Sequence, residues 1–402
     1  NRKKVTYMKK YNIPFSPPDI TEDEINEVAK VLRSGWITSG PKCVEFESEI
    51  EKYCKTQNAV TVNSATSGLE LVLKTLDIKQ GDEVISTPYT YTSTSSVCIN
   101  RGILPTLVDV KKGSFLIDEE KLYDAITPKT KAIMPVDIGG QPVDYDKIKE
   151  VLKAKNREDI VLLCDSAHSF GASYKGKKVG SQCDFHVFSF HAVKNLTTAE
   201  GGAVTFNNNN FNGKEDLKKE LKVNSLNGQT KDALSKMKLG SWKYDIVSNG
   251  MKCNMTDIMA AIGLVQLKRY EDMLKKRKAI YGIYNEALSK KEWAILPFEK
   301  DSKETETSYH LYPLRIRGFN EEKRSEVINA MAELGIATNV HFIPLPMFTL
   351  YKKLGYSIDN YPNAYAQYEN EISLPLYSIL KPEDAENVVK ELITCVEKII
   401  NK

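Results

Sequence analysis

The chain has 402 residues, of which 41% are hydrophobic and 27% charged, a composition typical of a globular protein with more than one core. Its formal net charge is only +3, and basic and acidic residues are intermixed, so nothing indicates nucleic-acid binding. Seven cysteines without paired spacing argue against a disulfide framework and for a reducing compartment. Because no apolar run approaches a membrane span and no signal-peptide core follows the basic start, we expect a cytoplasmic protein without a membrane partner.

The first predicted strand, residues 59–64, leads through a turn of small residues at 65–68 into an amphipathic helix. Such a turn presents the first N–H groups of the helix, and the positive end of its dipole, to an anion. The hydroxyls of Thr66 and Ser67 would add two donors. Taken alone, the turn is explained by a simple helix cap.

Short apolar runs alternate with helical patterns up to about residue 206, at 83–86, 106–110, 132–136, 160–164, 185–188 and 203–206. Strands that are apolar throughout and separated by helices indicate an α/β fold, with a mostly parallel sheet covered by helices on both faces. Sheets of this kind bind ligands at the carboxyl ends of their strands.

Two reactive side chains are predicted at these ends. Asp165 ends one apolar run, and Lys194 follows the next one. This is the pair that pyridoxal 5'-phosphate (PLP) requires, because the lysine amine binds the cofactor covalently and the carboxylate keeps its pyridine nitrogen protonated. Separately, the aspartate could close a salt bridge and the lysine could be solvated. Together with the phosphate turn, they indicate a PLP enzyme.

The remainder of the chain has fewer strand signals. A long helix is predicted over about residues 256–290, then strands at 309–316 and 337–343, and a final amphipathic helix at 382–400. We therefore expect a large PLP-binding domain, residues 1–270 with the N-terminal segment, and a smaller C-terminal α+β domain, residues 271–402.

Other chemistries lack sequence support. Residues 171–177 mimic the start of a nucleotide-binding P-loop, but Lys178 stands where a hydroxyl must hold magnesium. The five histidines lack metal-binding spacing, and no two cysteines lie close enough in sequence to complete a zinc site, so no metal is predicted. No Gly-x-Ser-x-Gly element supports serine hydrolysis.

The combined motifs resemble the DegT/DnrJ/StrS family of nucleotide-sugar aminotransferases, which have the fold type I architecture of aspartate aminotransferase. The most specific match is Ser189-Phe190-His191-x-x-Lys194 followed by Glu200-Gly201-Gly202. The resemblance runs nearly end to end and includes residues 35–41, 63–68, 81–85, 165–171 and 373–376.

The resemblance implies roles for several residues. Lys194 would bind the cofactor covalently, Asp165 would pair with the pyridine nitrogen, and His168 would lie near the ring hydroxyl. Tyr91 falls where family members stack an aromatic side chain on the cofactor ring. The implied phosphate-binding residues are Ala65, Thr66, Ser67 and Ser189.

The same family builds each site at a dimer interface, which implies a homodimer with shared active sites. Residues 250–254 match the loop that the partner subunit contributes, so Lys252 and Asn254 are expected at the neighbouring cofactor. Lys252 stands where many members have asparagine, although a lysine can still bind phosphate as a point charge.

Substrate contacts are harder to assign. In residues 136–140, Asp137 and Gly139 replace the histidine and the aromatic residue of many members, and Asp137 could lie near the sugar or cap a turn. The family places residues comparable to four others near the sugar nucleotide, although packing is an alternative for three of them, Trp36, His191 and His341. These four are Trp36, Thr38, His191 and His341.

The resemblance implies transfer of an amino group from L-glutamate, through pyridoxamine phosphate, to the ketone of a nucleotide-linked keto-deoxy sugar. The chain is most similar to sugar 4-aminotransferases, which serve cell-surface polysaccharide or amino-sugar biosynthesis. One alternative is a sugar dehydratase of the same fold, in which histidine replaces the lysine. Another is a non-catalytic PLP-binding regulator, in which Lys194, Asp165 or the phosphate turn would be eroded; all three are intact.

Overall fold

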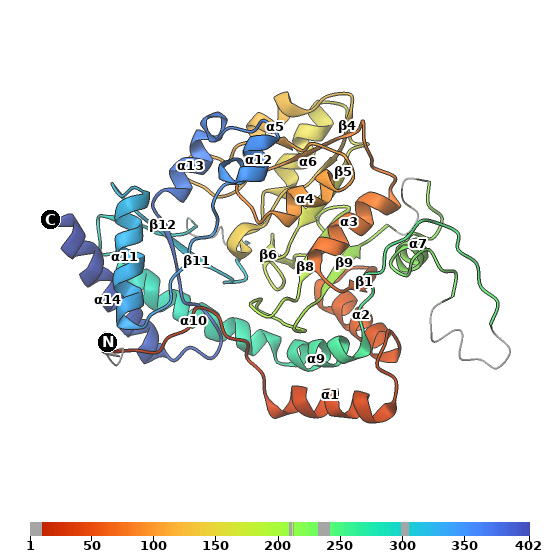
Figure 1. Ribbon diagram of the computed structural model, residues 1–402, viewed down its shortest axis with the longest axis horizontal. Helices are drawn as coiled ribbons and strands as arrows, with labels where there is room; N and C mark the ends of the chain where they lie inside the picture. The colour runs from red at the N-terminus through yellow and green to blue at the C-terminus, as the bar shows by residue number, and fades with distance from the viewer. Residues whose placement is uncertain (1–9, 209–210, 212, 232–241, 299–304) are drawn as a thin grey trace, which may run out of the picture.

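The computed structural model describes residues 10–208, 211, 213–231, 242–298 and 305–402. A seven-stranded sheet forms its centre (Figure 1). Only β9 runs antiparallel to its neighbours, so the predicted mostly parallel sheet is confirmed. In spatial order the strands are β1 (Asn58–Val62), β9 (Gly202–Phe206), β8 (Phe185–Ser189), β5 (Val161–Asp165), β4 (Thr130–Ile133), β2 (Glu83–Ser86) and β3 (Thr106–Leu107).

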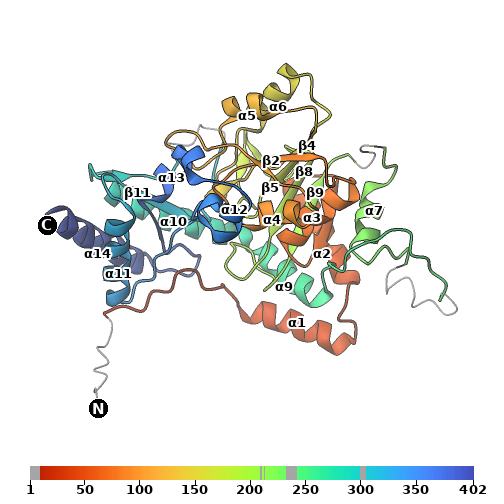
Figure 2. The ribbon, with the colours of Figure 1, turned by 45° about the horizontal axis from the view of Figure 1, so that its top comes forward.

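Helices cover both faces of this sheet. One apolar cluster joins the sheet to α3 (Ala65–Thr75), α4 (Ser93–Ile99) and α7 (Leu217–Asn224). The opposite cluster joins it to α2 (Pro41–Cys54), α5 (Glu119–Ala125), α6 (Tyr145–Ala154) and α9 (Asp257–Lys268). α1 (Glu22–Ser34) lies along α9, at the bottom of both ribbon views (Figures 1 and 2).

The side chains of β5 point alternately to the two faces of the large sheet. Leu163 belongs to the cluster that contains α3, whereas Leu162 and Cys164 belong to the cluster of α2 and α9. Successive side chains of a strand point to opposite faces, so Asp165 shares the face of Leu163. The same alternation along β8 puts Ser189 on that face, after Val187.

A smaller antiparallel sheet contains β10 (Ala294–Ile295), β11 (Tyr312–Ile316) and β12 (Glu371–Leu374). Its apolar cluster includes residues of three long helices, two of which, α11 and α14, lie at the left of Figure 1. These helices are α10 (Tyr270–Leu288), α11 (Glu321–Leu334) and α14 (Pro382–Ile400). The remaining elements of the described residues are the hairpin of β6 (Ser173–Tyr174) and β7 (Lys177–Lys178), helices α12 (Thr349–Lys353) and α13 (Pro362–Tyr368), and 3₁₀ turns at Ile138–Gly140, Leu345–Met347 and Ile358–Asn360.

Two sequence predictions were wrong in detail. The long helix expected over 256–290 is interrupted at Arg269, whose guanidinium binds Asp19 at 2.9 Å and Glu24 at 2.8 Å. Residues 337–343 do not form a strand, because only Asn339 pairs with β12. The His341 amide then donates to a side-chain carboxylate instead of a strand carbonyl.

The division at residue 270 stays a prediction. The N-terminal segment, expected with the large domain, makes backbone contacts with the end of α11: Tyr11 N donates to Leu334 O at 2.9 Å, and Ile13 N to Gly335 O at 3.0 Å. Among the described residues, no helix is both long and apolar enough to cross a membrane.

Candidate active site

A cavity of about 460 Å³ lies at the carboxyl edge of the large sheet. Its walls come from the turns that follow β1, β2, β4, β5 and β8, and from the segments around His310 and His341. Nine of the residues predicted from the sequence line this cavity: Ala65, Thr66, Tyr91, Asp165, His168, Ser189, His191, Lys194 and His341.

One end of the cavity is the N-terminus of α3. Ser64 caps the helix by accepting a 3.1 Å hydrogen bond from the amide of Ser67. Ala65 and Thr66 belong to the first turn, where amides lack helical partners and attract anions. Gly202 allows β9 to pass this turn, because a Cβ there would lie 2.8 Å from the nitrogen of Ala65.

Asp165 is buried at the end of β5, with 4% of its surface exposed. Its Oδ2 accepts a 2.7 Å hydrogen bond from the hydroxyl of Thr94, and its Oδ1 accepts a 3.2 Å bond from the amide of Ala167. Burial raises the pKa of this carboxyl, although both bonds and the charge of Lys194 oppose the shift. A cation beside Asp165 would therefore stabilise its ionised form.

Lys194 follows β8 and lines the same cavity. Burial lowers the pKa of its amine to about 8, while the charge of Asp165 acts in the opposite direction. At pH 7 about a tenth of the amine is therefore neutral, far more than for an ordinary lysine, and the neutral form is the one that a nucleophile or a general base requires.

His168 holds a defined tautomer. Its Nδ1 accepts a 3.1 Å hydrogen bond from the amide of Gly139, so the neutral ring carries its proton on Nε2. Burial and the charge of Lys194 hold the pKa of His168 well below its usual value. The ring is therefore a neutral hydrogen-bond donor.

Several lining residues received no role in the sequence analysis. His310 lies 4.4 Å from His168 between ring centroids, and its Nδ1 contacts Asn195 Oδ1 at 2.9 Å. Glu200 approaches His191, with 3.5 Å between Oε1 and Nε2. Phe342 also lines the cavity. No local pattern identifies His310, because its contacts with His168 and Asn195 join segments that lie far apart in the sequence.

Five predicted residues lie outside the cavity. The hydroxyl of Ser67 donates to Asn63 Oδ1 at 2.7 Å. The other four gather around Ser39: Trp36 Nε1 donates to the Ser39 carbonyl at 3.3 Å, and Asn254 Nδ2 donates to its hydroxyl. These five residues are Ser67, Trp36, Thr38, Lys252 and Asn254. Within one chain, the loop at 250–254 thus contributes nothing to the cavity of Lys194.

The structure fits neither of the two predicted roles of Asp137, a sugar contact or a cap. Its carboxylate is fully buried and points away from the cavity, which its neighbours Val136 and Ile138 line. It accepts four hydrogen bonds of 2.6–3.0 Å. The donors are the hydroxyls of Tyr145, Ser166 and Ser169 and the amide of Val143. Asp137 is therefore a buried structural acceptor that joins several segments, and its side chain does not cap the 3₁₀ turn that follows it.

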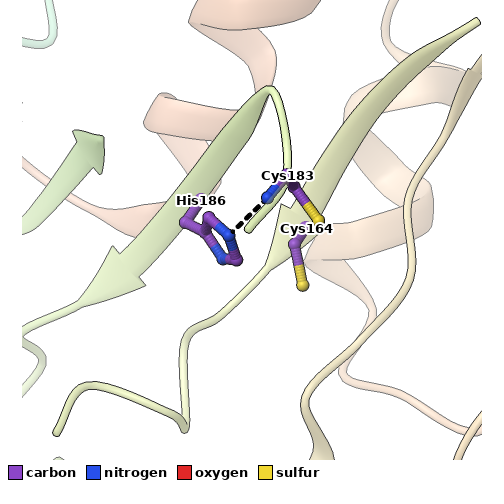
Figure 3. A group of neighbouring side chains, drawn as sticks. All are labelled: Cys164, Cys183 and His186. Atoms are coloured by element: carbon purple, nitrogen blue, oxygen red, sulfur yellow. Dashed lines mark hydrogen bonds between the residues drawn. The ribbon is translucent and has the colours of Figure 1, made fainter. Parts of the chain in front are cut away.

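One cluster that the sequence spacing did not reveal lies behind the site. Cys164, Cys183 and His186 bring their side-chain ligand atoms within 4.8 Å of one another (Figure 3). Nε2 of His186 accepts bonds from the amides of Gln182 at 3.1 Å and Cys183 at 3.0 Å, and Nδ1 contacts Ser166 Oγ at 2.9 Å. Both imidazole nitrogens are engaged, so the cluster is better explained as packing than as a metal site.

Comparison with known proteins places this site in a family. The model of the DegT/DnrJ/EryC1/StrS aminotransferase family matches residues 18–393. The spore coat polysaccharide biosynthesis protein SpsC of Bacillus subtilis is 40% identical over 94% of this chain and 95% of its own length.

Solved structures agree with this result. The structure of Spr1654 from Streptococcus pneumoniae in its pyridoxamine phosphate (PMP) form is 47% identical in sequence. The match covers 96% of this chain and 100% of the Spr1654 chain, with a TM-score of 0.92. Its PLP form superposes with a TM-score of 0.91. PseC of Helicobacter pylori, an aminotransferase involved in the biosynthesis of pseudoaminic acid, is 27% identical over 96% of this chain and 100% of its own, with a TM-score of 0.86. The fold type I prediction is confirmed, and the chain belongs to the DegT/DnrJ/EryC1/StrS aminotransferase family.

Proposed function

We propose that this PLP-dependent sugar aminotransferase moves an amino group from L-glutamate to the C4 ketone of a nucleotide-linked keto-deoxy sugar. The observation that carries the proposal is the meeting of Asp165, Lys194 and the N-terminus of α3 in one cavity. These three features are a carboxylate, an amine and an anion site, which are the groups that PLP requires.

The residues fit the cofactor chemically. Asp165 is a buried carboxyl group without a cation bonded to it among the described residues, so a protonated pyridine nitrogen would satisfy it. Ala65, Thr66 and Ser189 would hold the phosphate group, and Tyr91 would cover the ring. When bound, PLP supplies an electron-withdrawing ring that takes up the electrons of a broken C–H bond.

The protein side chains then manage protons. Lys194 would bind the cofactor covalently at rest and, once released, carry a proton between two carbon atoms, a task that suits an amine with a pKa of about 8. His168 would donate its Nε2 hydrogen to the ring hydroxyl oxygen, since Nδ1 is engaged with Gly139. Asp165 would stay ionised opposite the pyridine nitrogen.

The sugar assignment is supported by the relatives. SpsC takes part in spore coat polysaccharide biosynthesis and PseC in pseudoaminic acid biosynthesis, so we infer that this chain serves cell-surface polysaccharide or amino-sugar biosynthesis. His191 and His341 line the cavity and are proposed as sugar contacts.

We propose a homodimer with shared sites. Lys252 is exposed and lies outside the cavity of its own chain, as expected for a residue that reaches the partner's cofactor phosphate. Trp36, Thr38 and Asn254 lie in the same region and would approach the partner's site with it. Two-fold pairing is the commonest closed symmetry.

The decisive experiment offers the purified protein a panel of UDP- and dTDP-linked 4-keto and 3-keto sugars with glutamate, aspartate or alanine as donor. We expect amination of a 4-keto sugar with glutamate, detected by mass spectrometry as an amine in place of the ketone. Equal turnover with pyruvate or oxaloacetate as acceptor would contradict the sugar assignment. Preference for a 3-keto sugar or another donor would correct only the finer assignment.

A further inference from the structure

Glu371 is a fully buried carboxyl group of β12 that none of the roles above uses. Each of its oxygens has one partner. Oε1 accepts a 2.6 Å hydrogen bond from the hydroxyl of Ser373, and Oε2 accepts a 2.9 Å bond from the amide of His341. Residues i and i+2 of a strand share a face, which explains why Ser373 meets this carboxyl group.

The contact continues to the cavity. The hydroxyl of Ser373 also contacts Nδ1 of His341 at 2.9 Å, and His341 lines the cavity that holds Lys194. The imidazole stacks on Phe15 at 5.3 Å and meets Phe342 edge-on at 5.0 Å, so its orientation is fixed. In the described part of the chain, no protein group bonds Nε2 of His341, which leaves this nitrogen to a ligand.

A hydroxyl has a single hydrogen, which couples the tautomer of His341 to the charge of Glu371. When Glu371 is ionised, Ser373 donates to it and accepts from Nδ1–H, so Nε2 is a hydrogen-bond acceptor. When Glu371 is protonated, it donates to Ser373, which donates to Nδ1, and Nε2 carries the hydrogen. The two states differ by one proton, and the imidazole is neutral in both.

We propose that Glu371, Ser373 and His341 form a proton relay that moves one proton between the substrate cavity and the buried carboxyl group. In the inward direction, a proton binds Nε2 of His341, the Nδ1 proton passes to Ser373 Oγ, and the Ser373 proton passes to Glu371 Oε1. Only these N–H and O–H bonds form and break. The use of this relay in turnover rests on the proposed function, whereas the tautomer switch itself does not.

The groups around the relay keep the imidazole of His341 neutral, as both relay states require. Burial and the charge of Lys194 lower the pKa of His341 to about 3. Burial raises the pKa of Glu371 to about 8, against the opposing effects of its two hydrogen bonds and the charge of Arg324. The titratable and charged groups around the relay are Arg324 of α11, Arg315 of β11, Tyr89, Lys194, His168 and His310. Near pH 8, both relay states are therefore populated.

Nitrogen NMR of the holoenzyme labelled with ¹⁵N-histidine tests the switch without any substrate. We expect the protonated and unprotonated signals of His341 to exchange between Nδ1 and Nε2 as the pH rises, with a midpoint near the Glu371 pKa of about 8. The variant His341→Asn assigns the signals by their loss. A His341 tautomer that stays the same across this range would overturn the relay.

Two variants break the relay at different points. Glu371→Gln cannot ionise, and Ser373→Ala removes the bridging hydroxyl, so both should abolish the tautomer exchange of His341 near pH 8. The matched control Glu322→Gln removes an exposed carboxylate of α11 and should keep the wild-type midpoint. Exchange that persists unchanged in either relay variant rules out the proposal. If Glu371→Gln does not fold, Ser373→Ala alone decides it. A wild-type protein that shows the tautomer switch but aminates no nucleotide sugar would contradict the proposed function and leave the switch standing.

Discussion

The amide of Asp137 donates a 3.1 Å hydrogen bond to the carbonyl oxygen of Asp165, which joins two buried aspartates through their main chains. Their carboxylates have separate tasks. That of Asp165 faces the cavity, whereas that of Asp137 binds the hydroxyls of Ser166 and Ser169 in the next turn. The turn that carries His168 is thus fixed from behind by a carboxylate that never meets the ligand.

Asp137→Ala should lower the free energy of unfolding by about 3 kcal/mol, because four buried donors would lose their acceptor. Urea denaturation followed by circular dichroism measures the change. Asp272→Ala, which truncates a side chain that is 74% exposed, is the control and should stay near wild type. Equal free energies of unfolding for Asp137→Ala and Asp272→Ala would contradict the structural role of Asp137.

Lys194→Ala should abolish covalent attachment of the cofactor, while the anion site at α3 still retains some of it non-covalently. Among the described residues that line the cavity, Lys194 is the only lysine. Borohydride reduction followed by peptide mapping checks the assignment. As a control, Lys178→Ala changes a lysine of the β7 hairpin, and borohydride should still fix the cofactor to Lys194 in this variant. A reduced adduct on any lysine other than Lys194 would contradict the prediction.

Much of this site could be predicted from local sequence, because a strand's carboxyl end and its alternation fix where a side chain goes. Asp165 ends one apolar strand and Lys194 follows another, and each strand can be recognised by itself, whereas Ser189 was expected only from the family resemblance. Thr94 gave no such signal, since its bond to Asp165 depends on how α4 packs against the sheet.

Contacts between distant segments escaped the sequence analysis for a related reason. His310 precedes β11 and contacts Asn195 in the turn after β8, so its position depends on how the small sheet docks on the large one. Glu371 begins β12 and binds His341, which lies 30 residues earlier in the chain. The proximity of Cys164 and Cys183 likewise arises from pairing between β5 and the start of β8. Spacing along the chain cannot reveal such pairs.

Asp165→Asn should bind cofactor but slow the half-reaction with glutamate, on the order of 10²-fold or more, since a neutral amide cannot hold the pyridine nitrogen protonated. Single-turnover absorbance measures the rate. Thr94→Val serves as a graded comparison, because it removes one 2.7 Å bond to the carboxylate and keeps the charge. An Asp165→Asn rate close to that of wild type would make Asp165 purely structural.

Glu371 should make the stability of the protein depend on pH. Its pKa is about 8 in the fold against 4.5 for an unperturbed glutamate, so the folded state binds more protons between these values. The contribution of Glu371 is therefore fully present below about pH 4.5 and is lost as the pH rises through about 8, up to about 5 kcal/mol in total. Thermal unfolding of wild type and Glu371→Gln in paired buffers isolates the effect. As the pH rises, the Tm of the wild type should fall relative to the Tm of Glu371→Gln. If the two Tm values change in parallel with pH, the raised pKa of Glu371 is excluded.

Shared sites predict complementation between two inactive chains. If Lys252 reaches the partner's cofactor phosphate, Lys252→Glu places a negative charge there and inactivates the neighbouring site, whereas Lys194→Ala inactivates its own. In a mixed dimer both defects fall on one site and the other is intact, so mixing the two variants should restore part of the wild-type activity.

Lys290→Glu, which alters a side chain that is 71% exposed, is the matched charge reversal and should stay active alone. Mass spectrometry of differently tagged chains verifies that hybrids form, and hybrids without activity would mean that each subunit builds its site alone.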